Sequence, residues 1–509
     1  MKKTLPFLLF ATSVAFAQLP EKQIDELVEK TLKTFDVPGI AVAVIKDGKV
    51  VHSKGYGLRS VLSKDKVDAN TLFGIASNSK AFTSAALAIL VDEKKLDWDE
   101  KVVKFIPEFK MYNDYVTNEF TIRDLLTHRS GLGLGAGDLM IWPDQNNFTT
   151  ADIIKNLRYL KPVSAFRTKY DYDNLLYIVA GEVIARASGQ SWCDFVDNRI
   201  LKPLEMKQTA SAWNRLKDTS NVIVPHVPTD GKLKVIKRYK GKVFDPAAGL
   251  YSSVNDLSKW VLMQLQDGKY GNKQLFSKHV HDEMWTSQTI LPNRKAVPYT
   301  SNFRNYGLGW QLTDINGHLQ VSHTGGLDGI VTQVLMIPDL DFGVVVLTNQ
   351  QSGAAFTAIS NTIKDSYLKL PAFDHIANLS KDSHQKEDDA DKITDEVWAT
   401  ISKNHKNNIK PELKNYAGSF LDDWFGVIHL TENDGKFYFS SERSPQLSGE
   451  IYFYKDQTFV VKWFNRSFLA DSFLTFTDLH HIKMKAVSPL TDFSYDFHDL
   501  DFRRAKASR

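Results

Sequence analysis

The residues most suited to chemistry are Ser77 and Lys80, which stand one helical turn apart. Residues three apart on a helix project from the same side, so the hydroxyl and the amine can meet. A serine hydroxyl becomes a strong nucleophile when a base takes its proton, and a lysine can be that base if burial lowers its pKa. The apolar helical run over residues 81–90 predicts that Ser77 begins a buried helix, whose free N–H groups favour developing negative charge.

The spacing between Ser77 and Lys80 is a weak signal by itself, because a solvated helix surface produces it often. The chain repeats this spacing at Ser63 and Lys66, Ser366 and Lys369, and Ser383 and Lys386. Two further motifs, which follow in order along the chain, distinguish Ser77 from these serines.

The second motif is Tyr172-Asp173-Asn174, which precedes another apolar helical run. A phenol beside an ammonium group loses its proton more easily, so Tyr172 could accept the serine proton and pass it to a leaving group. The amide of Asn174 can both donate and accept, which suits a substrate amide or the head of Lys80. The alternative is that Tyr172 only packs, since the same spacing recurs in a turn at 270–272.

The third motif is His323-Thr324-Gly325-Gly326, at the end of an alternating run typical of a strand. Glycines here would let a substrate backbone approach the strand closely. A lone histidine is more often structural than catalytic, but the position of His323 between two predicted strands favours a functional role.

Together these three motifs resemble those of the serine β-lactamase and penicillin-recognising peptidase superfamily. The tyrosine of the second motif resembles the class C branch, which includes DD-carboxypeptidases, esterases and D-aminopeptidases. The resemblance covers residues 22–370 and implies an α/β fold, a β-lactamase/transpeptidase-like antiparallel sheet flanked by helices with a helical insertion. The implied catalytic residues are Ser77, Lys80, Tyr172 and His323, and the implied substrate and oxyanion-binding residues are Asn174, Gly325 and Gly326.

The motif at His323 departs from the β-lactamase pattern, in which lysine begins K-[ST]-G. A permanent cation would hold a substrate carboxylate, whereas histidine is mostly neutral near pH 7. We therefore expect a serine hydrolase that forms an acyl-enzyme with amides, esters or peptides, including peptides with D-residues. The alternatives are a β-lactamase or DD-carboxypeptidase, and a non-catalytic ligand-binding or sensing protein that keeps the fold.

Composition narrows the function classes further. The chain has 509 residues and a formal net charge of +3, with no basic patch that would indicate nucleic acid. Residues 1–17 have the pattern of a signal peptide cleaved after Ala17, which predicts a periplasmic or secreted protein without another membrane span. The only cysteine is Cys193, and no metal-binding or cofactor motif is present, so we expect neither a metal nor a cofactor.

The predicted domains are a hydrolase domain over 18–375, a charged linker over 376–412 that is partly disordered, and a small all-β domain over 413–509. The last resembles a lipocalin-like barrel, and its predicted strands include Phe468 to Phe476 and Phe493 to Phe502. We expect a small-molecule or peptide substrate as partner, and the edges of the C-terminal domain could join subunits into an oligomer.

Overall fold

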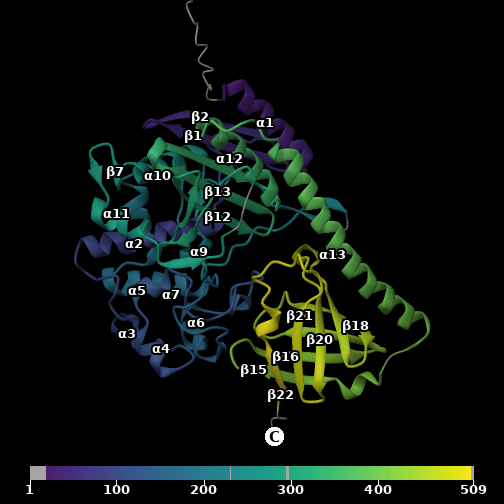
Figure 1. Ribbon diagram of the computed structural model, residues 1–509. Coiled ribbons are helices and arrows are strands. Elements are labelled where there is room, and N and C mark those ends of the chain that lie inside the picture. The colour runs from purple at the N-terminus through teal and green to yellow at the C-terminus, as the bar shows by residue number, and fades with distance from the viewer. Residues whose placement is uncertain (1–18, 230, 294–296, 410, 506–509) are drawn as a thin grey trace, which may run out of the picture.

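The computed structural model describes residues 19–229, 231–293, 297–409 and 411–505. A β-barrel lies at the lower right of an α/β domain, and a long helix, α13 (His375–Lys406), runs down the right-hand side of both (Figure 1). The expected signal peptide, residues 1–17, lies outside the described residues.

The α/β domain is built on an antiparallel sheet of eight strands in the order β2-β1-β14-β13-β12-β11-β10-β9. The strands β1 and β14 come from opposite ends of the domain's sequence but are neighbours in the sheet. Val42 of β1 lies opposite Val346 of β14. The apolar run over 307–312 predicts a strand, but residues 307–310 connect β10 to β11, so the strand begins only at Gln311. The strand bounds are β1 Gly39–Lys46, β2 Lys49–Gly57, β9 Thr289–Leu291, β10 Arg304–Tyr306, β11 Gln311–Ile315, β12 His318–Leu327, β13 Ile330–Ile337 and β14 Phe342–Thr348.

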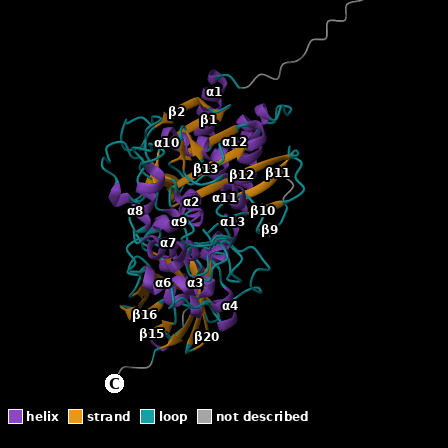
Figure 2. Cartoon of the chain, turned by 90° about the vertical axis from the view of Figure 1, so that its left-hand side faces the viewer, coloured by secondary structure: helices purple, strands orange, loops and turns teal. Residues whose placement is uncertain are grey.

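Helices cover both faces of this sheet, because its central strands are apolar on both sides. Val42 and Val44 of β1 pack with α1 (Glu21–Thr34) and α12 (Gly353–Tyr367), whereas Ala41 and Ala43 face the larger core. That core contains α2 (Ser79–Asp92) and α10 (Val254–Leu265). Figure 2 shows the helices on the two sides of the strands. The predicted fold class is confirmed.

The middle of the chain supplies the predicted helical insertion, which lies below the sheet in Figure 1. Thr149 begins α6 with a capping box, because its side chain and that of Asp152 satisfy each other's backbone N–H groups. The remaining helices are α3 Val102–Phe105, α4 Asp114–Glu119, α5 Ile122–Leu125, α6 Thr150–Asn156, α7 Leu175–Ser188, α8 Trp192–Val196, α9 Asp245–Ala248 and α11 Lys278–Met284. A two-stranded sheet pairs β3 Phe73–Gly74 with the distant β6 Tyr251–Ser252, and short hairpins pair β4 His226–Thr229 with β5 Lys232–Val235 and β7 Lys269–Tyr270 with β8 Lys273–Gln274.

Helix α13 occupies the segment that the sequence predicted to be a partly disordered linker, so this expectation was wrong for its structure. The side chain of Asp374 caps the helix by accepting the N–H of Ala377 at 3.0 Å. Val397 and Ile401, one turn apart, pack against Val460 of the barrel and neighbouring apolar side chains. A narrow apolar stripe thus orders a helix whose other faces are charged.

The C-terminal domain is a closed barrel of eight antiparallel strands, in which each strand pairs with the next and the last pairs with the first. Large aromatic side chains fill its interior, including Phe437, Phe459 and Trp463. The predicted all-β domain is confirmed, and its likeness to lipocalins stays a prediction. The strand bounds are β15 Gly418–Asp422, β16 Gly426–Asn433, β17 Lys436–Ser441, β18 Ser448–Lys455, β19 Thr458–Trp463, β20 Ser472–Asp478, β21 His481–Ala486 and β22 Asp501–Arg504.

One barrel segment departs from the prediction in a way that bears on function. Residues 493–502 were expected to form a strand, but only Asp501 and Phe502 belong to β22. The preceding residues leave the barrel wall and contact the α/β domain, where the backbone N–H of Gly137 donates to Asp496. We call residues 487–500 the strap. Alternating apolar residues resemble a strand in sequence, but here they pack between two domains.

None of the helices in the described ranges combines the length and apolar character needed to cross a bilayer.

Candidate active site

Ser77 lies in a single 3-10 turn, Ala76–Asn78, immediately before α2. The preceding Ala76 has φ +51°, a left-handed conformation that costs an alanine about 1 kcal/mol or more. The turn is held by the core of the sheet, because Thr332 Oγ1 donates to the carbonyl of Ile75 at 2.9 Å and accepts from Asn78 at 2.9 Å. Packing therefore fixes a strained turn that presents the serine hydroxyl.

Lys80 lies beneath this hydroxyl and is fully buried. Its Nζ is 3.1 Å from Ser77 Oγ, 2.6 Å from Asn174 Oδ1 and 3.1 Å from the carbonyl oxygen of Ala247. Burial lowers the pKa of Lys80 to about 7, although Asp138 and other nearby carboxyl groups act in the opposite direction. A substantial fraction of the amine is therefore neutral at neutral pH, as a proton acceptor must be.

Asn174 connects the lysine to a second buried residue, Asp138. The Asn174 amide accepts from Lys80 through Oδ1 and donates through Nδ2 to Asp138 Oδ2 at 2.7 Å. Desolvation raises the pKa of Asp138 well above its usual value. The structure therefore places Asn174 against the lysine head, which is one of the two roles that the sequence allowed.

Tyr172 lies beside both Ser77 and Lys80. The amine of Lys80 is 4.8 Å from the centre of the Tyr172 ring, and the ring of His128 packs against the phenol at 4.2 Å. Burial raises the pKa of Tyr172 well above 10, while the neighbouring Ser77 hydroxyl lowers it in part. The sequence suggested that the cation would ease loss of the phenol proton, but desolvation has the larger effect. These directions favour Lys80 as the base and Tyr172 as a proton donor.

His323 is buried on β12 and lines a cavity that Ser77 and Tyr172 also line. Its Nδ1 donates to the carbonyl of Thr324 at 2.6 Å, so Nε2 accepts the hydroxyl proton of Tyr306 at 2.9 Å. Burial, with a smaller contribution from the nearby charge of Lys80, lowers the pKa of His323 to about 3. The imidazole is therefore neutral, and this position lacks the permanent cation that a lysine would bring.

The two glycines of the third motif lie in different environments. A Cβ at Gly325 would lie 2.3 Å from the carbonyl oxygen of Ile75, so this glycine allows β12 to approach the Ser77 turn. A Cβ at Gly326 would meet no atom within 4 Å, and Gly326 lines the cavity together with Ser77. Gly325 therefore has a packing role, and the oxyanion role that the resemblance implies for Gly326 stays a prediction.

These residues surround a cavity of about 450 Å³, which suits a small molecule or a short peptide segment. One wall comes from the strap, whose Phe493 packs edge-to-face on Tyr172 at 5.7 Å. The residues of the sequence motifs that line the cavity are Ser77, Tyr172, Asn174, His323, Thr324 and Gly326.

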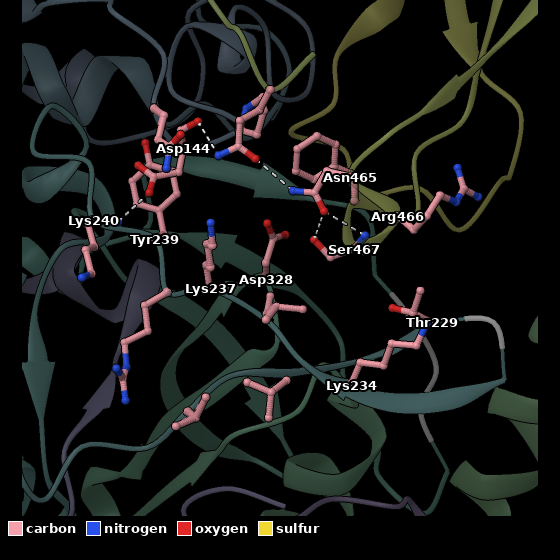
Figure 3. Close-up of a pocket in the computed structure, with 18 residues that line it drawn as sticks. Asp144, Thr229, Lys234, Lys237, Tyr239, Lys240, Asp328, Asn465, Arg466 and Ser467 are labelled. Atoms are coloured by element: carbon pink, nitrogen blue, oxygen red, sulfur yellow. Dashed lines mark hydrogen bonds between the residues drawn. The ribbon is translucent and has the colours of Figure 1, made fainter. Parts of the chain in front are cut away.

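A larger cavity, of about 710 Å³, lies between the β4–β5 hairpin and the barrel (Figure 3). Asp328 lines both cavities, so the larger one adjoins the site of Ser77. Its wall includes Lys237, Tyr239 and Arg466, but none of the residues predicted to be catalytic. We therefore assign the chemistry to the smaller cavity.

Sequence reasoning missed three contributors to the site: Asp138, Tyr306 and the strap. Asp138 stands in a glycine-rich loop and Tyr306 at the end of a short strand, and neither carries a motif. The strap comes from another domain, where only an apolar alternation marked it. Spatial proximity, rather than a local pattern, identifies all three.

One group in the described chain could offer three metal ligands, namely Asp267, His281 and Asp282. The ammonium of Lys278 already lies 3.1 Å from Asp267 and 2.9 Å from Asp282. This group lines neither cavity described above.

Comparison with known proteins agrees with this geometry. The Beta-lactamase family matches residues 24–368, and a domain of unknown function (DUF3471) matches residues 403–504. Unguisins hydrolase ungD' of Aspergillus campestris is 30% identical over 365 residues, 69% of this chain and 66% of that protein. Protein flp of Staphylococcus aureus strain MW2 is 31% identical over 337 residues, 65% of this chain and 64% of that protein. The matched stretch therefore spans slightly less than two thirds of each relative.

A solved structure extends the likeness to both domains. The octameric penicillin-binding protein homologue from Pyrococcus abyssi aligns over 95% of this chain and 100% of that chain, with a TM-score of 0.61 and 21% identity. At this identity the alignment establishes a common fold. Since the family match covers most of the chain, the protein belongs to the Beta-lactamase family.

Proposed function

We propose that the protein is a serine hydrolase that forms an acyl-enzyme on Ser77 and acts on amides, esters or peptides, including peptides with D-residues. The observation that carries this proposal is the 3.1 Å contact between Ser77 Oγ and the buried Lys80 amine, whose pKa is about 7, at the edge of a cavity. The similarity to the Aspergillus relative, which is named as a hydrolase, supports it.

The proposed reaction begins when neutral Lys80 takes the proton of Ser77 and the serine oxygen attacks the acyl carbonyl. The backbone N–H groups of Ser77 and Gly326 stabilise the oxyanion. Tyr172 gives a proton to the leaving group and recovers one from Lys80. Water then attacks the acyl-enzyme with Lys80 again as the base, which regenerates Ser77 and releases the acid.

Neutral His323 favours an esterase or peptidase over a β-lactamase. A histidine whose pKa is about 3 carries no charge to hold the carboxylate of a β-lactam or of a C-terminal residue. Rapid hydrolysis of a chromogenic cephalosporin would favour the β-lactamase alternative instead.

The direct test is covalent labelling of purified protein with a fluorophosphonate, read by intact mass beside a Ser77→Ala variant. We expect one adduct on the wild type and none on the variant, because only a deprotonated serine at 77 attacks the probe. A folded wild-type protein that takes no adduct would contradict the proposal and favour the ligand-binding alternative.

Export and assembly belong to the same proposal. The pattern of residues 1–17 supports cleavage after Ala17 and a periplasmic or secreted location, which N-terminal sequencing of the exported protein would check. The Pyrococcus protein of the same fold is described as octameric, which supports an oligomer of this chain. The C-terminal barrel is closed, so the predicted contact through free strand edges of this domain is not available. Light scattering on the purified protein would measure its mass.

A further inference from the structure

The strap reaches the catalytic lysine through buried polar contacts. Asp496, fully buried, accepts the backbone N–H of Gly137 at 2.6 Å and that of Leu139 at 3.0 Å. These two amides flank Asp138, so one carboxyl group of the barrel domain fixes the backbone on both sides of this residue. The strap also provides Ser494, whose side chain lowers the pKa of Asp138.

From Asp138 the path continues to the reacting atoms. Asn174 Nδ2 donates to Asp138 Oδ2 at 2.7 Å, and Asn174 Oδ1 lies 2.6 Å from Lys80 Nζ. Lys80 Nζ in turn lies 3.1 Å from Ser77 Oγ. Every side chain on this path except that of Ser77 is buried, so water does not substitute for a lost partner.

The strap also makes apolar contact with the site. Phe493 packs on Tyr172, and the carbonyl oxygen of Phe493 would lie 2.7 Å from a Cβ at Gly135. The backbone N–H of Gly135 donates to the carbonyl of Tyr172 at 2.8 Å. The loop that carries Asp138 is thus held between the strap and the Tyr172 segment.

We propose that Asp496 is a positioning residue: by fixing the loop around Asp138, it sets the position of Asn174 and Lys80 and makes the barrel domain part of the catalytic machinery. The inference rests on the proposed function only for its effect on rate. Its structural content, the connection from the barrel to the lysine, stands independently of any substrate.

The experiment uses the full chain and the variant Asp496→Asn, in which the amide keeps the shape but presents N–H donors toward backbone N–H groups. The matched control is Asp422→Asn, because Asp422 is a buried barrel carboxyl that accepts the N–H groups of Trp424, Phe425 and Asp501 within the barrel. Hydrolysis of p-nitrophenyl acetate gives kcat and KM, and hydrogen exchange gives the protection of residues 135–142 and 172–176.

For Asp496→Asn we expect kcat to fall about 10- to 100-fold with KM nearly unchanged, because a displaced lysine slows the chemical step more than binding. Exchange should rise in both segments. Asp422→Asn should lower the stability of the barrel while leaving kcat and these two segments unchanged. Equal losses of kcat in both variants, or a wild-type kcat in Asp496→Asn, would overturn the proposal.

A second variant, Ser494→Ala, removes only one buried hydroxyl and should preserve the fold if Asp496→Asn does not. It should lower kcat severalfold, whereas Ser472→Ala, at a buried barrel serine, should not.

If the wild type takes no fluorophosphonate and hydrolyses no ester, the proposed function fails. Hydrogen exchange then tests by itself whether Asp496 fixes the loop around Asp138. Unchanged exchange at 135–142 in Asp496→Asn would overturn that structural connection.

Discussion

At the scale of single residues, the reactivity of the site depends on the protonation of Lys80. Its amine is buried among carbonyl and amide oxygens that suit an ammonium, yet desolvation lowers its pKa to about 7. Tyr172 is desolvated as well, which raises its pKa. The lowered pKa of Lys80 suits a base, and the raised pKa of Tyr172 suits a proton donor.

This difference predicts the pH dependence of the reaction. The neutral amine is the active form, so kcat/KM should be low below pH 7 and rise through about pH 7 as Lys80 loses its proton. Lys80→Arg keeps a cation that does not deprotonate and should lower kcat/KM by about 100-fold or more. Ester hydrolysis measured from pH 5 to pH 9 checks both statements, and an Arg variant with the wild-type profile would contradict them.

Much of the site could be predicted from the sequence at the level of residues, and the parts that could not have physical reasons. Ser77, in the turn before α2, and Lys80, in the first turn of α2, are three residues apart, so spacing alone predicts their contact. Asp138 and Tyr306 enter the site because loops and strands from distant parts of the chain converge there. The low pKa of His323 depends on burial, which no spacing of residues reveals.

At the scale of elements, the close approach of β12 to the Ser77 turn decides where the nucleophile stands. A Cβ at Gly325 would overlap the carbonyl oxygen of Ile75, whereas one at Gly326 would project into open space. Two adjacent glycines therefore provide a variant and its own control.

We predict that Gly325→Ala lowers the free energy of unfolding by about 1 to 3 kcal/mol, because the strand and the turn must separate. The same displacement should slow labelling of Ser77. Gly326→Ala should change the free energy of unfolding by less than about 0.5 kcal/mol. Urea unfolding of both variants tests this, and equal stability of the two would show that the turn adapts to the added methyl group.

Elements were predictable where pattern and packing agree. The sequence predicts strands over 330–337 and 342–348, which are the bounds of β13 and β14, because each is an apolar run between turn residues. Helix α13 and the strap were mispredicted for a shared reason. Helix α13 is ordered by contacts with the barrel, and the strap by contacts with the α/β domain. By itself, the charged sequence of α13 favours a solvated segment, and the alternating sequence of the strap favours a strand.

At the scale of the whole molecule, the barrel and the α/β domain are joined by specific polar contacts. Asn156 Nδ2 donates to the carbonyl of Trp424 at 2.8 Å, and Arg443 binds Asn147 at 2.7 Å and Asp152 at 3.0 Å. Together with Asp496, these contacts include buried groups that would lose their partners if the domains separated.

This interface predicts that the two domains unfold together. Calorimetry of the full chain should give one thermal transition, because separating the domains breaks the hydrogen bonds that Asp496 and Asn156 make across the interface, each with a net contribution of about 0.5 to 1.5 kcal/mol. Asp496→Asn should weaken the coupling, so that the barrel melts first and a second transition appears. Asp434→Asn, in an exposed barrel turn where asparagine also accepts φ +51°, should keep the single transition. Two separate transitions in the wild type would mean that the barrel is an independent appendage, and its strap would then reach Lys80 without stabilising the domain it enters.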